Sequence, residues 1–292
     1  MIDIGVNLLH PQFDPDRQAV IERSRLAGIT RMILTGTDLE VSRAAVDLCR
    51  QLGRALVCTA GIHPHDARSA PSGWREELRA LAREAPVVAI GETGLDFNRN
   101  FSPPHIQEKL FRDQLALAAE LNLPVFVHER DASDAVLQAL NDVLGRRGCE
   151  SLGIVVHCFT GDLSALDNYL ELGCHIGITG WICDRRRGAG LRALVPRIPL
   201  DRLLVETDAP FLRPHNAPAD NHGRRNEPAL LPWVIATLAE QLELSPGQIA
   251  QQTAANAQRL FRLFPSPSGF SDPSGFPDPT GPQPASRADP PR

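Results

Sequence analysis

Short apolar stretches alternate with amphipathic stretches along residues 1–264. The apolar stretches are rich in Ile, Val and Leu and are apolar throughout, and they fall at residues 2–6, 32–35, 55–60, 87–90, 125–127, 154–156, 175–179 and 203–205. The stretches between them carry apolar residues at a spacing of about 3.6, as in Leu110, Leu115, Leu117, Ala118 and Leu121. Strands that are apolar on both faces, each followed by a helix, predict a parallel sheet covered by helices.

The number and spacing of these units predict how the sheet is arranged. A unit of roughly 30 residues recurring over about 264 residues predicts an α/β fold of the closed (β/α)8 TIM-barrel type. The alternative is an open, doubly wound sheet, which would have a glycine-rich phosphate loop after its first strand. Residues 7–13 contain no glycine, so the sequence favours the barrel.

The chain changes character at its end. Residues 265–292 contain 9 Pro, 5 Ser and 3 Gly, arranged in part as a degenerate six-residue repeat. Proline removes backbone donors and glycine adds chain entropy, so this composition predicts a disordered, low-complexity tail. The predicted domain is therefore residues 1–264.

Composition excludes several classes of protein. Lys plus Arg number 30 and Asp plus Glu 35, so the formal charge is −5, and any contact with phosphates must come from a local cluster of cations. No apolar run approaches the roughly 18 residues of a membrane span, and the first residues do not resemble a signal peptide. The six cysteines have no Cys-x-x-Cys spacing, which predicts reduced thiols in a cytoplasmic protein.

Four of the expected strand ends carry a side chain that can bind a metal ion. These residues are Glu92, His128, His157 and Asp208. In a barrel the carboxyl ends of all strands face the same mouth, and so many titratable groups placed together are costly without a counter-ion. The pattern therefore predicts a divalent metal site, and the mixed nitrogen and oxygen donors suit Zn²⁺, Mn²⁺ or Mg²⁺.

Other polar residues follow the same strand ends. His63 and His65 either contact the substrate or support their loop through hydrogen bonds. Asp96 can cap the turn that follows it, and Glu206 can orient a metal ligand.

Arginines cluster in segments expected to lie over the same rim: Arg99, Arg130, Arg185–Arg187, Arg224 and Arg225. They predict either a solvated surface or a local phosphate-binding rim.

Four segments in register resemble the signatures of TatD-family metal-dependent deoxyribonucleases. They are residues 91–96, 124–128, 157–161 and 206–210, and the likeness extends from residue 2 to about residue 264. Residues 3–8, 94–101 and 177–181 resemble the branch of TatD itself. The resemblance implies a barrel of the metal-dependent hydrolase type that hydrolyses DNA with 3′-to-5′ exonuclease action on single-stranded ends, supported by Mg²⁺.

The resemblance also assigns roles to residues. Glu92, His128 and His157 match metal ligands, and Asp208 matches the aspartate that binds metal or takes a proton from the attacking water. His63, His65 and Arg130 are the candidates to bind the substrate and stabilise charge on phosphorus. The implied partner is DNA, with no membrane, and the chain is expected to act as a monomer.

One departure from the family pattern concerns the first strand. Many members have His-x-His at its end, whereas this chain has Gly5-Val6-Asn7. We therefore expect one firmly held cation, with a second recruited partly by substrate phosphate. A metal-dependent amidohydrolase acting on a small molecule remains the alternative enzyme, and a non-catalytic binding protein would have lost one of the four ligands.

Overall fold

Eight parallel strands form the centre of the protein. The computed structural model describes residues 1–53, 55–218 and 223–263; the predicted tail at residues 265–292 and its boundary at residue 264 lie outside the described residues. The strands pair in chain order, and they are β1 (Ile2–Val6), β2 (Arg31–Leu34), β3 (Leu56–Ala60), β4 (Val87–Asp96), β5 (Val125–Arg130), β6 (Ile154–Val156), β7 (His175–Ile178) and β8 (Leu203–Val205). The predicted (β/α)8 architecture is confirmed.

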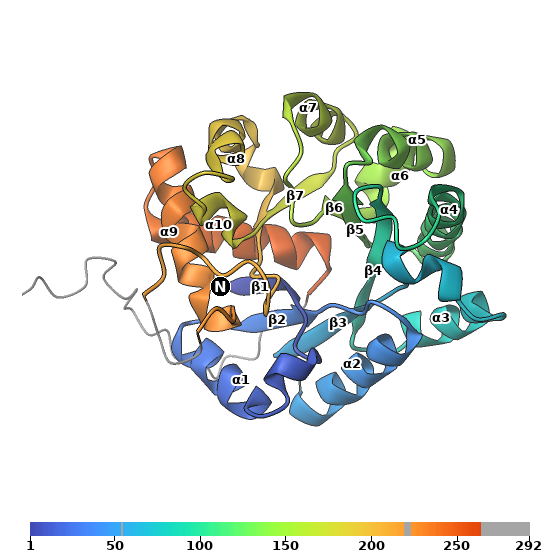
Figure 1. Cartoon of the computed structure of the whole chain (residues 1–292), viewed down its shortest axis with the longest axis horizontal. Helices are drawn as coiled ribbons and strands as arrows, with labels where there is room; N and C mark the ends of the chain where they lie inside the picture. Colours follow the sequence, from blue (N-terminus) through green and yellow to red (C-terminus); the bar gives the residue numbers. More distant parts are fainter. Residues whose placement is uncertain (54, 219–222, 264–292) are drawn as a thin grey trace, which may run out of the picture.

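The barrel closes just beyond β8. Val6 pairs in parallel with Ala209, and the Asn7 backbone nitrogen donates to the Ala209 carbonyl oxygen at 2.8 Å. Helices surround the strands (Figure 1), and their bounds are α1 (Arg17–Leu26), α2 (Leu39–Leu52), α3 (Trp74–Ala82), α4 (Pro104–Leu121), α5 (Ser133–Val143), α6 (Gly145–Leu152), α7 (Leu163–Glu171), α8 (Ala189–Leu194), α9 (Leu231–Leu242) and α10 (Pro246–Leu260). None of the helices in the described ranges is long and apolar enough to cross a membrane.

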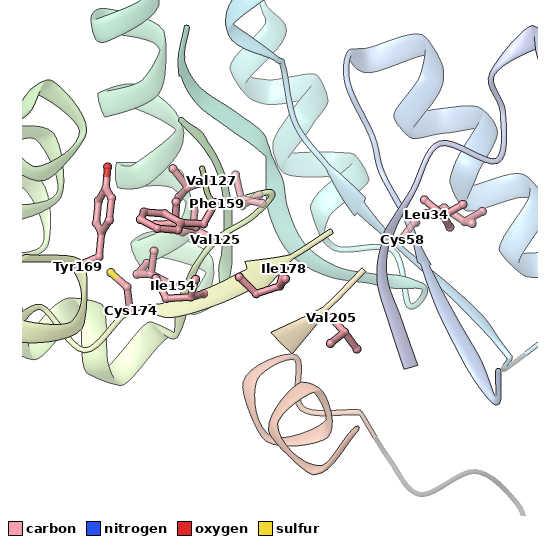
Figure 2. Close-up of a cluster of buried hydrophobic side chains, with 14 of the residues drawn as sticks. Leu34, Cys58, Val125, Val127, Ile154, Phe159, Tyr169, Cys174, Ile178 and Val205 are labelled. Atoms are coloured by element: carbon pink, nitrogen blue, oxygen red, sulfur yellow. The ribbon is translucent and has the colours of Figure 1, made fainter. Parts of the chain in front are cut away.

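Alternate residues of each strand enter two different cores. Val125 and Val127 on β5 belong to the cluster between strands and helices, which Figure 2 shows next to Phe159 and Tyr169. Phe126, between them, belongs to a second cluster inside the barrel. Side chains along a strand alternate between its two faces, so both faces of these strands are buried. This is the physical reason for the uninterrupted apolar runs in the sequence.

The end of α10 and the residues directly after it close one end of the barrel. Leu260, Phe261 and Leu263 pack into the interior cluster with Ile2 and Ile4, near the start of the chain. The amino ends of the strands are therefore sealed by apolar side chains. The opposite end, where the strands finish, is left for the polar residues.

Two strands are longer than the apolar pattern predicts. β4 extends to Asp96 and β5 to Arg130, six and three residues beyond the predicted ends. Thr93 and Gly94 on β4 pair with Val127 and His128 on β5, so these polar residues continue the ladder. The apolar pattern ends before the strands do, because the side chains become polar where the strands reach the site although the backbone pairing continues.

Candidate metal centre at the barrel mouth

The interior face of the barrel changes from apolar to polar at the carboxyl ends of the strands. Phe126 on β5 and Val155 on β6 lie in the interior cluster. Two positions further along a strand a side chain points the same way, and those positions hold His128 and His157. The rings of Phe126 and His157 stack with centroids 4.5 Å apart, so the apolar interior directly supports the polar cluster.

Glu92 is the centre of that cluster. It lies within β4 and is only 6% exposed. Its Oε1 atom is 2.8 Å from His128 Nδ1 and 2.8 Å from His157 Nε2, and 3.2 Å from His63 Nε2. One imidazole within β5 and two that follow β3 and β6 therefore meet at one carboxylate oxygen.

Asp208 reaches the same cavity from the seam where the barrel closes. Its backbone nitrogen donates to the Gly5 carbonyl oxygen at 2.9 Å, and its Oδ1 accepts from Asn7 Nδ2 at 3.0 Å. Asn7 thus uses its side chain to hold Asp208 at the end of β1. Together with Glu92 and His157, both residues line a cavity of about 600 Å³ at the mouth.

His63 has the geometry of a hydrogen-bond donor. Its Nδ1 accepts the backbone N–H of His65 at 3.1 Å, so this nitrogen carries no proton. Burial lowers the pKa of His63 to about 4, although Glu92 opposes the shift, and the ring is therefore neutral at pH 7. A neutral imidazole carries one proton, which we infer to lie on Nε2, the nitrogen that faces Glu92.

Asp96 does more than close a turn. Its Oδ1 accepts from the backbone nitrogens of Asn98 at 3.1 Å and Arg99 at 2.8 Å, as predicted. Its Oδ2 lies 2.7 Å from His65 Nε2 and 3.4 Å from His128 Nε2. The expected turn cap did not include this second role. The signal for it was the spacing of Glu92 and Asp96, which places both on one face of a strand.

Glu206 fills the space beneath His157. It is fully buried; its Oε1 accepts from the Cys158 backbone nitrogen at 2.6 Å, and its Oε2 lies 3.4 Å from His157 Nδ1. A Cβ atom on Gly5 would lie 2.3 Å from Glu206 Oε2, and one on Gly177 would lie 2.7 Å from Oε1. Two glycines therefore make room for this carboxylate, and any side chain at position 5 or 177 would collide with it.

The charges of the site are strongly coupled. Burial raises the pKa of Glu92, but His63 and His157 outweigh burial and hold that pKa well below its usual range. Burial lowers the pKa of His157, but Glu92 and Glu206 outweigh it and raise that pKa well above 6.5. Burial raises the pKa of Asp208 to about 7, partly offset by His157. One carboxylate is thus firmly ionised while another can exchange a proton near neutral pH.

The donor set fits a divalent cation. One ligand atom from each of His63, Glu92 and His128 lies within 4.8 Å of the others. Because Nε2 of His63 carries the proton, Glu92 and His128 are the members of this group that can bind a cation, and His157 Nε2 lies 2.8 Å from the same Glu92 oxygen. With Glu206 facing Nδ1 of His157, the Nε2 atom of that ring is the nitrogen left to ligate a cation. Carboxylate oxygen and imidazole nitrogen donors suit several divalent ions, so the chemistry admits more than one metal.

The arginines divide into two groups. Arg99, Arg130 and Arg187 line the mouth cavity; the guanidinium of Arg187 lies 4.6 Å from the centroid of the Trp181 ring. Arg225 instead makes a two-bonded ion pair with Asp16, both contacts at 2.7 Å. The prediction that Arg225 belongs to a phosphate-binding rim is therefore wrong, because Arg225 forms an ion pair with Asp16, a residue distant in the sequence.

The sequence matches known proteins over nearly its whole length. A family model described as TatD related DNase matches residues 2–262. A protein of Pectobacterium atrosepticum named 3′-5′ ssDNA/RNA exonuclease TatD is 48% identical over 263 residues, covering 90% of this chain and 100% of the relative. A protein of the same name from Cronobacter sakazakii is 49% identical over 272 residues, covering 92% of this chain and all of the relative.

Solved structures give the same result. A TatD homologue from Escherichia coli K12, YJJV, is 31% identical and superposes with a TM-score of 0.79, covering 90% of this chain and 98% of that one. A TatD family hydrolase from Entamoeba histolytica has a TM-score of 0.81 at 25% identity, covering 91% and 98% of the two chains. On these sequence and structural matches, the chain belongs to the TatD-related DNase family.

Proposed function

We propose that this protein is a metal-dependent exonuclease that removes nucleotides from the 3′ ends of single-stranded DNA. The observation that carries the proposal is the buried convergence of His63, His128 and His157 on Glu92, inside a cavity with arginines in its wall. Arginine suits phosphate oxygens, and the relatives named as 3′-5′ exonucleases match the chain over their full length. Mg²⁺ is the proposed cation.

The proposed ligands are Glu92, His128, His157 and Asp208. A bound divalent cation supplies Lewis acidity, which acidifies the attacking water and neutralises charge on the phosphate. Glu206 holds His157 in the tautomer that frees Nε2 for that role. Asn7 fixes the direction of the Asp208 carboxylate through its hydrogen bond to Oδ1.

The residues of the chain divide the proton and charge transfers between them. Asp208 takes the proton of the attacking water, as a carboxylate whose direction Asn7 fixes. His63 donates a hydrogen bond from its Nε2–H group to a phosphate oxygen that gains charge in the transition state. Arg130, whose Nη1 donates to Thr160 Oγ1 at 2.5 Å, presents a positive charge to the same cavity, and Asp96 orients the ring of His65 beside it.

The cavity suits the end of a strand. Its volume of about 600 Å³ lies within the range of small-ligand pockets, roughly 300–1,000 Å³. It opens on one side only, since α10 seals the amino ends of the strands. We infer that a chain end enters the mouth and that the catalytic groups cut near that end. A small-molecule amidohydrolase would need no arginines in this wall.

The test is digestion of single-stranded DNA oligonucleotides labelled at the 5′ end, after removal of metal and addition of Mg²⁺, Mn²⁺ or Zn²⁺ separately. We expect a ladder that shortens from the 3′ end. Glu92→Gln should lower the rate at least 100-fold, whereas Glu84→Gln, which removes an exposed carboxylate paired with Arg50, should not. Internal fragments, or full activity in the Glu92 variant, would refute the proposal. Labelled RNA in the same assay measures the preference between the two nucleic acids.

We further propose that the protein acts as a monomer in the cytoplasm and that its working domain ends near residue 264. The free, largely buried cysteines of the described chain agree with a reducing compartment. Analytical ultracentrifugation of the purified protein measures the oligomeric state, and a dimer at micromolar concentration would refute the first statement.

A further inference from the structure

Two aromatic side chains are left exposed beside the site. Among the described residues, the exposed large hydrophobic side chains are Leu26, Leu52, Phe101, Leu163 and Phe211. The two phenylalanines both lie in loops that follow strands at the barrel mouth, after β4 and after β8. Aromatic rings fixed beside a positively charged groove are the surface on which proteins stack the bases of single strands.

Phe211 is held firmly although its ring is 46% exposed. Its backbone nitrogen donates to the Asp208 carbonyl oxygen at 3.0 Å, and its own carbonyl oxygen accepts from Asn226 Nδ2 at 2.7 Å. The ring meets the His10 ring edge to face, with centroids 5.3 Å apart. It lines the mouth cavity, so it presents a fixed aromatic surface three residues from the proposed proton acceptor.

Phe101 is held in a similar way on another loop. Its ring is 61% exposed and meets the ring of His65 edge to face at 4.7 Å. The next residue, Ser102, is fully buried; its hydroxyl donates to the His65 carbonyl oxygen at 2.9 Å, and its own carbonyl oxygen accepts from Gln107 Nε2 at 2.7 Å. The loop is therefore anchored while the ring of Phe101 faces solvent.

The two rings flank the site from opposite sides. β4 and β8 are four strands apart in an eight-stranded barrel whose strands pair in order, so their loops face one another across the mouth. The third aromatic residue at the mouth, Trp181, is engaged differently, because the guanidinium groups of Arg187 and Arg130 lie 4.6 and 5.3 Å from its ring centroid. The arginines thus cluster at Trp181, and the two phenylalanine faces stay open.

We propose that Phe101 and Phe211 stack with unpaired nucleobases, one on each side of the scissile phosphate, and thereby select single-stranded substrate. Proteins that bind single strands combine a positive groove for the phosphates with aromatic rings for the bases. Stacking is independent of base identity, so it gives single-strand preference without sequence preference. A base paired in a duplex has its faces covered and cannot stack on these rings. This inference rests on the proposed function.

The experiment compares Phe101→Ala and Phe211→Ala with Leu26→Ala, a control that removes exposed apolar surface at the end of α1, far from the mouth. Stacking of one base is worth roughly 5- to 150-fold in affinity. We expect each phenylalanine variant to raise KM for single-stranded oligonucleotides about tenfold, with the melting temperature and the Kd for Mn²⁺ unchanged. Phe211→Trp should restore KM, which a purely structural role would not predict.

A substrate with one abasic nucleotide identifies the base that each ring contacts. Removing the contacted base should raise KM of the unaltered protein about tenfold, and should add little more in the matching phenylalanine variant. The inference would be overturned if the effects of the abasic substitution and of the phenylalanine substitution on KM multiplied at every abasic position. It would also be overturned if KM were unchanged in both variants, and that result would assign the rings to another partner.

A binding measurement separates this inference from the proposed function. Fluorescence of 2-aminopurine in a single-stranded oligonucleotide, recorded without turnover in EDTA, should be quenched by the protein and less so by the variants. Quenching by a protein that cleaves no DNA with any metal would refute the exonuclease function and leave the stacking sites. Cleavage without quenching at any position would refute the stacking sites alone.

Discussion

Replacing Glu206 with Gln tests whether the buried carboxylate controls the metal site through His157. Glutamine keeps the volume of the side chain and one oxygen for the Cys158 backbone nitrogen, 2.6 Å from Oε1. The other position then becomes an NH₂ group that faces His157 Nδ1 across the 3.4 Å contact. Two N–H donors cannot face each other, so the ring is driven to the tautomer with its proton on Nε2, where it cannot ligate a cation.

The expected loss follows from the role of such carboxylates. Removing a group that orients a metal-bound histidine costs roughly 10- to 100-fold in metal affinity, or about 1.4–2.7 kcal/mol. The fold should survive, because glutamine keeps the oxygen that accepts from the Cys158 backbone nitrogen. The cradle formed by Gly5 and Gly177 also accepts glutamine without new contacts, since its size matches that of glutamate.

The assay is calorimetric titration of the metal-free protein with Mn²⁺ at constant pH, combined with thermal unfolding. Glu227→Gln is the matched control: Glu227 is 4% exposed and accepts two close hydrogen bonds from Arg23, at 3.0 and 2.7 Å. It should lose stability but keep the Kd for Mn²⁺. A Glu206→Gln protein that is folded and binds Mn²⁺ within twofold of the unaltered protein would refute the tautomer argument.

Three further predictions concern regions away from Glu206. Burial, and to a smaller extent Arg202, lowers the pKa of His175 from 6.5 to about 4. Below pH 6.5 the unfolded chain therefore binds a proton at His175 that the native state does not. The contribution of His175 to stability is complete above pH 6.5 and is lost as the pH falls toward 4. In urea unfolding, the loss of unfolding free energy between pH 6.5 and pH 5 should be about 1–2 kcal/mol smaller for His175→Gln than for the unaltered protein. Parallel pH profiles of the two proteins would contradict this prediction. Arg130→Ala, which removes a cavity-lining guanidinium bound by the Thr160 hydroxyl, should reduce the log–log salt slope of single-stranded DNA binding by about 0.7, whereas Arg225→Ala, which loses its pair with Asp16, should leave the slope unchanged. Deleting residues 265–292 should leave Tm and activity nearly unchanged, because so proline-rich a segment buries little apolar surface; a fall in Tm of several degrees would show that it packs on the barrel.

Local pattern was sufficient for the architecture. A strand buried on both faces must be apolar throughout, and a crossover helix must follow it, so the order of elements was readable without contacts. The same logic located Glu92, His128 and His157, because polar groups at the end of an apolar strand stand out. Strand ends were less predictable, since β4 and β5 keep pairing after their side chains become polar.

What the sequence by itself determined, then, was the barrel and the set of residues facing its mouth; the partners of those residues were decided by the tertiary structure. His63 shares the oxygen of Glu92 with two other imidazoles, which depends on how the loop after β3 approaches β4. Arg225 pairs with Asp16, 209 residues away along the chain, so a basic pair in the sequence became a structural ion pair. Such distances and protonation states depend on which strands become neighbours and on how closely they approach. The periodicity of one segment carries no information about the neighbours of that segment or about their distance.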